Sequence, residues 1–190
     1  MISAILLAAG QSKRLAGENK LIKYFKNKPL INHSIDALIK SKVNKIIIVL
    51  GYQSNQVKKL IKKNKKISFV INKNYKKGMS TSIKCSLSKI SKKNKGFIIF
   101  QSDMPFIKAK HLDKICSSIS KKKHLVHALK FRNRVGNPIG FDISVLNKFK
   151  KIKGEFGAKF MVKRLKKQTN FIKVTSGKIF KDFDLKKDFS

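Results

Sequence analysis

Three of the nine acidic residues in this 190-residue sequence stand where they could hold a metal ion. Asp103 closely follows the apolar run from Phe97 to Phe100 and precedes Met104-Pro105, so it falls just beyond the carboxyl end of a predicted strand. Asp182 and Asp184 are two positions apart, which places both side chains on one face of an extended backbone. Mg²⁺ usually takes one or two protein carboxylates together with substrate phosphates. The pattern therefore favours a Mg²⁺ site in which one of the later pair joins Asp103. The alternative for Asp103 is a helix N-cap or a turn, although the scarcity of acids adds weight to the metal role. For Asp182 and Asp184, capping of a helix that starts near Leu185 explains the spacing equally well.

A second group of residues could bind an anion. The segment Leu7-Ala8-Ala9-Gly10-Gln11-Ser12-Lys13-Arg14 follows the first apolar run, and Lys20 comes six residues later. Its small residues let a ligand approach the backbone, whose successive N–H groups could form an anion nest. Arg14 offers a planar fork to phosphate oxygens, and Lys20 offers a mobile point charge. The spacing matches neither a Walker A loop nor a Gly-x-Gly-x-x-Gly motif, so the alternative is an ordinary loop with two of many basic residues.

Two further loops could contact a substrate. The segment 74–82 supplies Gly78 with the hydroxyls of Ser80 and Ser82 before a predicted helix, which suits base or ribose contacts but also helix capping. Gly136-Asn137-Pro138 follows two arginines, so it predicts either a site for an acceptor phosphate or a turn.

The elements that must position these residues alternate between strands and helices. The α/β order predicts a doubly wound, mostly parallel, Rossmann-like sheet in one domain spanning residues 1–190. Ligands of such sheets bind beyond the carboxyl ends of the strands, where Asp103 and the first loop fall. Strands are expected at 3–8, 45–50, 67–71, 97–100, 125–131 and about 171–174, and helices at 29–40, 53–63, 81–90 and 108–119, with two short helical stretches after 131.

The formal charge of +37 admits two interpretations. Lysine-rich surfaces bind nucleic acids through their phosphates. However, the lysines are spread over almost every segment, only four of the 46 basic residues are arginines, and no nucleic-acid-binding motif is present. We therefore favour compositional drift and expect no specific nucleic-acid partner, although the charge would attract anionic substrates.

The remaining composition predicts a cytoplasmic protein that does not enter a membrane. Cys85 and Cys116 have no metal-ligand spacing to each other or to a histidine, which indicates a reducing compartment. No apolar run approaches the roughly 20 residues of a membrane span.

Taken in order along the chain, these motifs resemble those of the MobA-like nucleotidyltransferases, and most closely the molybdenum cofactor cytidylyltransferase branch. The motifs are the loop 7–14 with Lys20, Gly51-Tyr52, the segment 78–82, Asp103-Met104-Pro105, Gly136-Asn137-Pro138, Gly154-Glu155-Phe156-Gly157-Ala158 and Asp182-Phe183-Asp184. Leu7-Ala8-Ala9-Gly10 is typical of the cytidylyl branch, whereas Leu-Ala-Gly-Gly is typical of the guanylyl branch.

The resemblance implies transfer of CMP from CTP to the terminal phosphate of molybdopterin, with release of pyrophosphate. It also implies a passing contact with a molybdoenzyme or its chaperone. An alternative is a cytidylyl- or uridylyltransferase that acts on a sugar phosphate or another phosphorylated alcohol. The implied roles are catalysis for Arg14, Lys20 and Asp103; nucleotide binding for Leu7, Ala8, Ala9, Gly10, Ser12, Arg14, Lys20, Gly78, Ser80 and Ser82; Mg²⁺ ligation for Asp103 and Asp184; and acceptor binding for Gly136, Asn137, Pro138 and Asp182.

Overall fold

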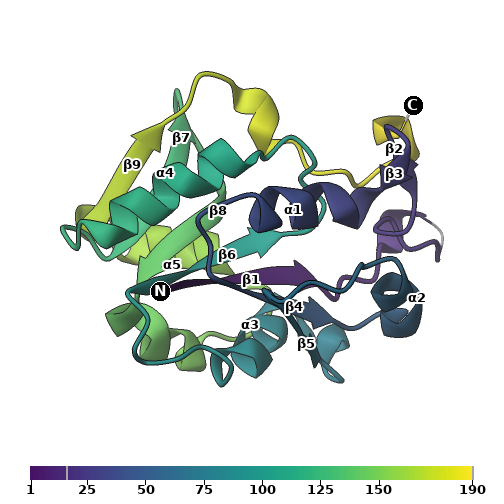
Figure 1. The fold of residues 1–190 in the computed structure, drawn as a ribbon, viewed down its shortest axis with the longest axis horizontal. Helices are drawn as coiled ribbons and strands as arrows, with labels where there is room; N and C mark the ends of the chain where they lie inside the picture. The colour runs from purple at the N-terminus through teal and green to yellow at the C-terminus, as the bar shows by residue number, and fades with distance from the viewer. Residues whose placement is uncertain (16, 190) are drawn as a thin grey trace.

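A computed structural model, which describes residues 1–15 and 17–189, shows a seven-stranded sheet with helices on both faces (Figure 1). The strand order is β5-β4-β1-β6-β8-β7-β9. The bounds are β1 Ile2–Ala8, β4 Lys45–Leu50, β5 Ile67–Ile71, β6 Gly96–Gln101, β7 Val126–Phe131, β8 Arg134–Asp142 and β9 Thr169–Lys173. A separate two-stranded sheet pairs β2 (Tyr24–Phe25) with β3 (Lys28–Pro29). The doubly wound α/β fold is confirmed.

Four parallel strands form the half of the sheet that carries the first loop. β1 lies between β4 and β6, and β5 forms the edge beyond β4. Their apolar side chains face helices on both sides, which explains why β1, β4 and β6 are continuous apolar runs. All four carboxyl ends meet at one edge of the sheet, where the loop after Ala8 and the segment leading to Asp103 lie.

β8 departs from the predicted topology. It runs antiparallel to both β6 and β7, and its nine residues include Gly136-Asn137-Pro138. The alternative interpretation of this tripeptide as a turn is therefore wrong. Glycine and proline punctuate turns in sequence, but proline is tolerated at irregular strand positions, and the β7–β8 register shifts close by, between Ala128 and Leu129.

In the described part of the chain, five α-helices cover the sheet in two layers, one over each face (Figure 1). One apolar cluster packs α1, α2 and α4 against one face, and a second packs α3, α5 and a 3₁₀ helix at Ile143–Lys151 against the other. The bounds are α1 Leu30–Ile39, α2 Ser54–Lys59, α3 Met79–Leu87, α4 Ala109–Ser120 and α5 Ala158–Arg164. Among the described residues, no helix is both long and apolar enough to cross a membrane.

Two predicted helices begin or end elsewhere. α2 ends at Lys59 rather than Lys63, because the following residues turn toward β5. α3 begins at Met79 rather than Thr81, directly after Gly78, whose φ of 102° lies in the region that favours glycine. The earlier start brings the first turn of α3 to the edge of the sheet where the carboxyl ends of the strands meet.

The C-terminal segment, which follows β9, runs back across the molecule to the first loop. It leaves the far edge of the sheet at β9 and ends beside β2 and β3 (Figure 1). Phe183 is buried and packs its ring edge-on against Phe25, with the ring centroids 4.6 Å apart. This anchor sits between Asp182 and Asp184 and so fixes both acids near the start of the chain.

Candidate functional site

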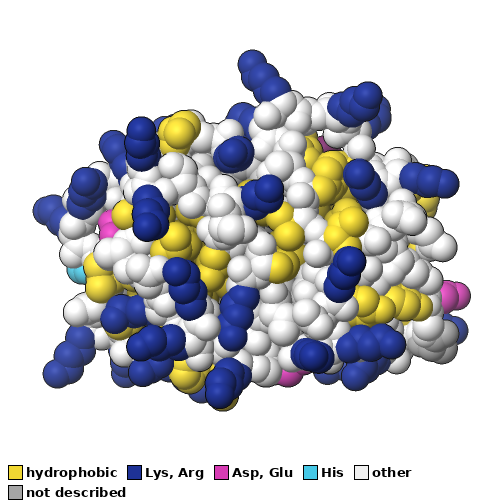
Figure 2. All heavy atoms as spheres, turned by 90° about the horizontal axis from the view of Figure 1, so that it is seen from below, with side chains coloured by type: hydrophobic (Ala, Val, Ile, Leu, Met, Phe, Trp, Pro, Cys, Tyr) yellow, Lys and Arg dark blue, Asp and Glu magenta, His cyan; other side chains and the backbone are white. Residues whose placement is uncertain are grey.

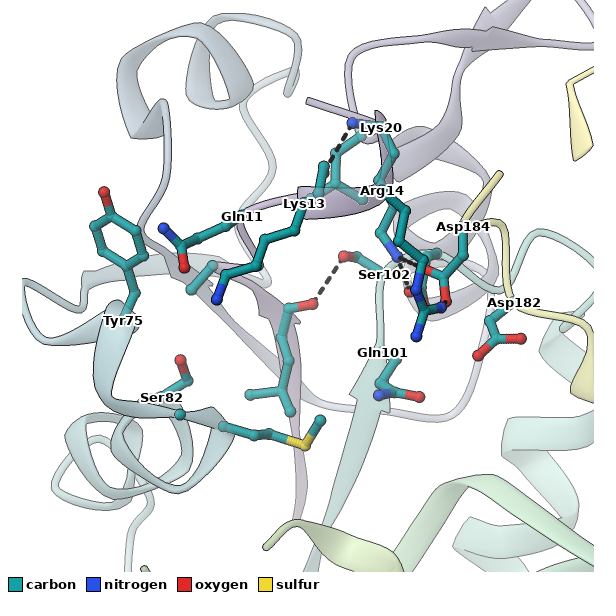
Figure 3. A pocket seen from close by; sticks show the side chains of 18 of the residues that line it. Gln11, Lys13, Arg14, Lys20, Tyr75, Ser82, Gln101, Ser102, Asp182 and Asp184 are labelled. Atoms are coloured by element: carbon teal, nitrogen blue, oxygen red, sulfur yellow. Dashed lines mark hydrogen bonds and ion pairs between the residues drawn. The ribbon is translucent and has the colours of Figure 1, made fainter. Parts of the chain in front are cut away.

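A cavity of about 450 Å³ opens at the carboxyl end of β1 and β6 (Figure 3). The loop after β1 forms one wall, the loop before α3 another, and the C-terminal segment closes the third side. It is lined by Leu7, Ala9, Gly10, Gln11, Ser12, Lys13, Arg14, Lys20, Leu21, Tyr75, Lys76, Gly78, Met79, Ser82, Gln101, Ser102, Asp103, Glu155, Asp182 and Asp184. Strands far apart in sequence thus place basic, hydroxyl and carboxylate groups around one space.

Lys20 joins two carboxylates within this cavity. Its Nζ lies 2.5 Å from Asp103 Oδ2 and 2.5 Å from Asp184 Oδ1. Arg14 adds a second cation, since its guanidinium donates to Asp184 Oδ2 at 2.7 Å. The Lys20 and Asp103 side chains are only 13% and 14% exposed, so their charges interact in a site with little water.

Burial and charge act against each other in this cluster. Burial alone would lower the pKa of Lys20, but the ion pairs and hydrogen bonds to Asp103 and Asp184 more than offset it, so the pKa lies above its ordinary value. Burial raises the pKa of Asp103, and the nearby carboxylates of Asp184 and Asp182 add to that rise, whereas Lys20 opposes it. The ammonium of Lys20 is therefore what makes two neighbouring carboxylates compatible with burial.

The donor set around Asp103 fits a divalent hard cation. Asp103 Oδ1 is a buried oxygen without a hydrogen-bond partner among the described residues, although a buried acceptor normally has one. Asp184 Oδ1 contacts the same Lys20 ammonium that contacts Asp103. The described part of the chain contains no group of three or more His, Cys, Asp or Glu side chains that could hold a metal ion without further ligands. Two carboxylates completed by phosphate oxygens match the Mg²⁺ preference.

Hydrogen bonds between hydroxyl side chains and backbone groups connect the first loop to its neighbours. Ser12 has a φ of 52°, and its hydroxyl accepts from the backbone N–H of Lys20 at 3.0 Å, which ties the loop to the lysine. The Ser102 hydroxyl donates to the Leu7 carbonyl at 2.7 Å and so couples the loop to the end of β6. A Cβ at Gly10 would meet no atom within 4 Å, so the backbone there faces open space.

The loop before α3 packs against the Gly154–Gly157 segment. A Cβ at Gly78 would come within 2.5 Å of the Gly154 carbonyl oxygen, which explains the glycine there. Glu155 accepts from the Met79 backbone N–H at 3.2 Å, and Gly154 accepts from the Ser80 N–H at 3.0 Å. The first turn of α3 is thus presented to the cavity by a second, distant loop.

Most residues selected from the sequence meet at this cavity. Those that line it are Leu7, Ala9, Gly10, Ser12, Arg14, Lys20, Gly78, Ser82, Asp103, Asp182 and Asp184. Ala8 and Ser80 are buried behind it, and Gly136, Asn137 and Pro138 are not among its lining residues. The capping alternative for Asp184 does not describe its side chain, which binds Lys20 and Arg14, while Asp188 accepts from the backbone N–H groups of residues 184 and 185.

Nine residues that line the cavity were given no individual role from the sequence, although most of them lie within the motifs named there: Gln11, Lys13, Leu21, Tyr75, Lys76, Met79, Gln101, Ser102 and Glu155. A signal existed for Gln101, because a polar residue ends an otherwise apolar strand at the sheet edge where ligands bind. Glu155 belongs to the Gly154–Ala158 motif of the resemblance, but its place in the cavity depends on the packing of two loops that are distant in sequence.

Comparison with known proteins gives one family match and several structural likenesses. The model of the MobA-like NTP transferase domain matches residues 4–169. The chain is 29% identical over 140 residues to the bifunctional protein GlmU of Caldicellulosiruptor saccharolyticus, a stretch of 72% of this chain and 29% of that protein. The chain therefore spans less than a third of the length of this relative.

Solved structures share the fold at low identity. Rv0371c from Mycobacterium tuberculosis superposes with a TM-score of 0.86 and 18% identity, covering 99% of this chain and 95% of that one. A structure of the same protein in complex with manganese gives a TM-score of 0.76 and 16% identity, covering 92% and 89%. A 4-diphosphocytidyl-2C-methyl-D-erythritol synthase from Anaerococcus prevotii gives a TM-score of 0.75 and 14% identity, covering 100% and 92%.

Proposed function

This chain belongs to the MobA-like NTP transferase family, and from that membership we propose that it moves CMP from CTP to the terminal phosphate of molybdopterin. In this reaction an oxygen of the acceptor phosphate attacks the α-phosphorus of CTP. The new P–O bond forms as the bond to the β-phosphate oxygen breaks, and pyrophosphate leaves with the electron pair. The acceptor phosphate itself is the nucleophile, so no side chain has to be one.

The observation that carries this proposal is the cluster of Asp103, Lys20 and Asp184 at the open end of the first loop. Phosphoryl chemistry depends mainly on positioning and on charge stabilisation, which such a cluster supplies. When a triphosphate lies on the loop, Lys20 and Arg14 can exchange their carboxylate partners for the β- and γ-phosphate oxygens. Their charge then stabilises the leaving pyrophosphate.

Asp103 and Asp184 would hold the divalent cation, for which we propose Mg²⁺. The bound ion would neutralise phosphate charge and orient the α-phosphate. The unpartnered Asp103 Oδ1 supports this assignment, and the manganese complex of the structurally similar mycobacterial protein is consistent with a metal site in this fold.

The cytidine assignment depends on the resemblance of Leu7-Ala8-Ala9-Gly10 to the cytidylyl branch. Ala9 and Ser82 line the part of the cavity that would receive the base, together with Tyr75 and the backbone of Gly78. Tyr75 and Ser82 lie together on one side of the cavity, away from the carboxylates (Figure 3).

A second candidate is transfer of a cytidylyl or uridylyl group to a sugar phosphate or another phosphorylated alcohol. It is favoured by the structural likeness to a protein whose name describes a diphosphocytidyl derivative of methylerythritol, and by the sequence similarity to GlmU. The two candidates share the triphosphate part of the site and differ in the acceptor and, for uridylyl transfer, also in the base.

The test is to incubate the protein and Mg²⁺ with each of the four NTPs, separately with molybdopterin and with a panel of sugar phosphates. Pyrophosphate release is then measured for every pair. Release with CTP and molybdopterin alone supports the first candidate, and release with a sugar phosphate instead supports the second. No release with any pair, combined with retention of an oligonucleotide on a filter at moderate salt, would favour a nucleic-acid-binding protein.

A further inference from the structure

Two amide side chains meet at the carboxylate end of the cavity. Gln101 ends β6 and lines the cavity, and Asn137 in the neighbouring β8 is buried behind it. Asn137 Nδ2 donates to Gln101 Oε1 at 2.7 Å. Asn137 itself is only 5% exposed, and its Oδ1 is buried without a partner in the described chain. Asn137 is therefore too buried to contact an acceptor directly, and it can serve the acceptor role expected for it only by orienting Gln101.

This contact orients the Gln101 amide. Since its oxygen is held by Asn137, its Nε2 group, with two N–H donors, is the part left to face the cavity. Gln101 Nε2 forms no hydrogen bond with another of the described residues. In Figure 3 the nitrogen of Gln101 points toward the middle of the cavity and its oxygen points away.

The position of the pair in the sheet assigns it to the acceptor half of the site. α3, which follows Gly78 and contains Ser82, contacts β1 and β4, whereas Gln101 and Asn137 lie on β6 and β8 at the other side of β1. An in-line attack brings the acceptor phosphate to the α-phosphate from the side opposite pyrophosphate. Gln101 precedes Asp103 by two residues, so the acceptor group nearest its amide is the attacking phosphate.

We propose that Gln101, oriented by Asn137, donates a hydrogen bond to an oxygen of the acceptor phosphate and so selects a phosphorylated acceptor. The inference rests on the proposed nucleotidyl transfer. A neutral amide suits this task better than one of the many lysines would, because a neutral hydrogen bond holds the phosphate while withdrawing less of the negative charge that makes it a nucleophile. Gln101 is the binding residue, and Asn137 is a positioning residue that acts through it.

The test uses inorganic phosphate as a probe of the acceptor site. The protein is saturated with Mg²⁺ and α,β-methylene-CTP, which fills the triphosphate site without reacting. Phosphate is then titrated while the ¹⁵N side-chain amide signals of Gln101 and Asn137 are recorded. The Gln101 signal is expected to shift with phosphate, with less change at Asn137.

Three variants separate donation from packing. Gln101→Met keeps the length of the side chain but removes the donor, and should weaken phosphate binding about ten-fold or more, the value of a hydrogen bond to a charged group. Gln101→Glu keeps an oxygen for Asn137 and turns another toward the phosphate, so binding should be lost. Asn137→Asp should reverse the Gln101 amide, because the new carboxylate accepts from Nε2 and leaves Oε1 facing the cavity, and should therefore mimic Gln101→Glu.

The affinity for α,β-methylene-CTP should stay unchanged in all three variants, and Gln168→Met, at the opposite end of the sheet, should behave as the wild type. Melting temperatures within a few degrees of wild type exclude misfolding as the cause of weaker phosphate binding. If a variant melts lower, the proposal is judged by the shift of the Gln101 amide signal when phosphate is titrated into the wild-type protein. Equal phosphate affinity in Gln101→Met and wild type, or no shift of the Gln101 signal, would overturn the proposal. If the phosphate results hold but wild type does not turn over molybdopterin, the acceptor of the proposed function is wrong and the amide pair stands.

Discussion

Replacing Lys20 by methionine should destabilise the metal-free protein and make its stability depend on Mg²⁺. The variant keeps most of the side-chain volume but removes the ammonium shared by Asp103 and Asp184. Removing one partner of a buried ion pair costs about 3–5 kcal/mol, because the remaining charge is buried without compensation. Asp184 is 32% exposed and keeps Arg14, so the lower end of that range applies. For a chain of 190 residues, a loss of about 3 kcal/mol lowers the melting temperature by roughly 6–12 °C.

Mg²⁺ should restore much of that loss in the variant and change the wild type little. In the wild-type protein the Lys20 ammonium lies between the carboxylates that the cation needs, so metal and ammonium compete. In Lys20→Met no ammonium lies between the carboxylates, and Mg²⁺ at one hundred times its Kd adds about 2.7 kcal/mol. The assay is the melting temperature with and without Mg²⁺ at constant ionic strength, adjusted with NaCl.

Lys65→Met is the matched control, because Lys65 is an exposed lysine in the turn before β5. It should melt within about a degree of wild type and show the wild-type response to Mg²⁺, since exposed substitutions usually stay within about 0.5 kcal/mol. Equal melting temperatures of Lys20→Met and Lys65→Met, or an equal gain from Mg²⁺ in all three proteins, would refute the view that Lys20 holds the carboxylate pair together.

Three further predictions concern the metal, the base and pH. Asp103→Asn should lower turnover about 10²–10³-fold with a normal circular dichroism spectrum, as for loss of an electrostatic contact to the transition state; near wild-type turnover with Mg²⁺ would exclude the ligand role. CTP should bind more tightly than GTP in calorimetric titrations with Mg²⁺, and the opposite order would contradict the cytidylyl assignment. Burial lowers the pKa of His127 to about 4, so the unfolded state binds more protons between pH 6.5 and 4. The free energy of unfolding should therefore fall as the pH drops through that window, by up to about 3 kcal/mol, and should fall less in His127→Asn. The urea midpoint of each protein is measured at pH 7 and at pH 4.5. The same decrease of the midpoint in both proteins would disprove this prediction.

The fold was predictable where local patterns agree with the tertiary structure. The apolar runs at β1, β4 and β6 are buried on both faces, so composition alone identifies them as central strands. β8 was not predictable in the same way, because Gly136 and Pro138 are residues of turns in most contexts. Its antiparallel place between β6 and β7 depends on packing: a Cβ at Gly136 would lie 2.5 Å from the Phe180 ring, which comes from the C-terminal segment.

The site residues that directly follow strands were predictable from the sequence, whereas those placed by contacts between distant segments were not. Asp103 and the first loop follow strands β6 and β1, so the topology of the sheet brings them together. The sequence could not decide whether Asp184 caps a helix or enters the site, because that depends on Phe183 packing against Phe25, more than 150 residues earlier. The pairing of Gln101 with Asn137 was hidden for the same reason, since it joins two strands whose neighbourhood the sequence did not reveal.

The proposed function requires a chain with a net charge of +37 to discriminate among anions, and the acids of the cavity offer a way to do so. Lysines are scattered over the surface rather than gathered in one patch, as the face in Figure 2 shows, so their field attracts every phosphorylated molecule with little preference. The acids are used differently, because four of the nine line one cavity. There Asp103 and Asp184 bind the basic residues of the first loop and would repel a bare triphosphate. In the proposed function a divalent cation bound to the triphosphate would remove that repulsion, and the scarce carboxylates would supply the selectivity that the abundant lysines cannot.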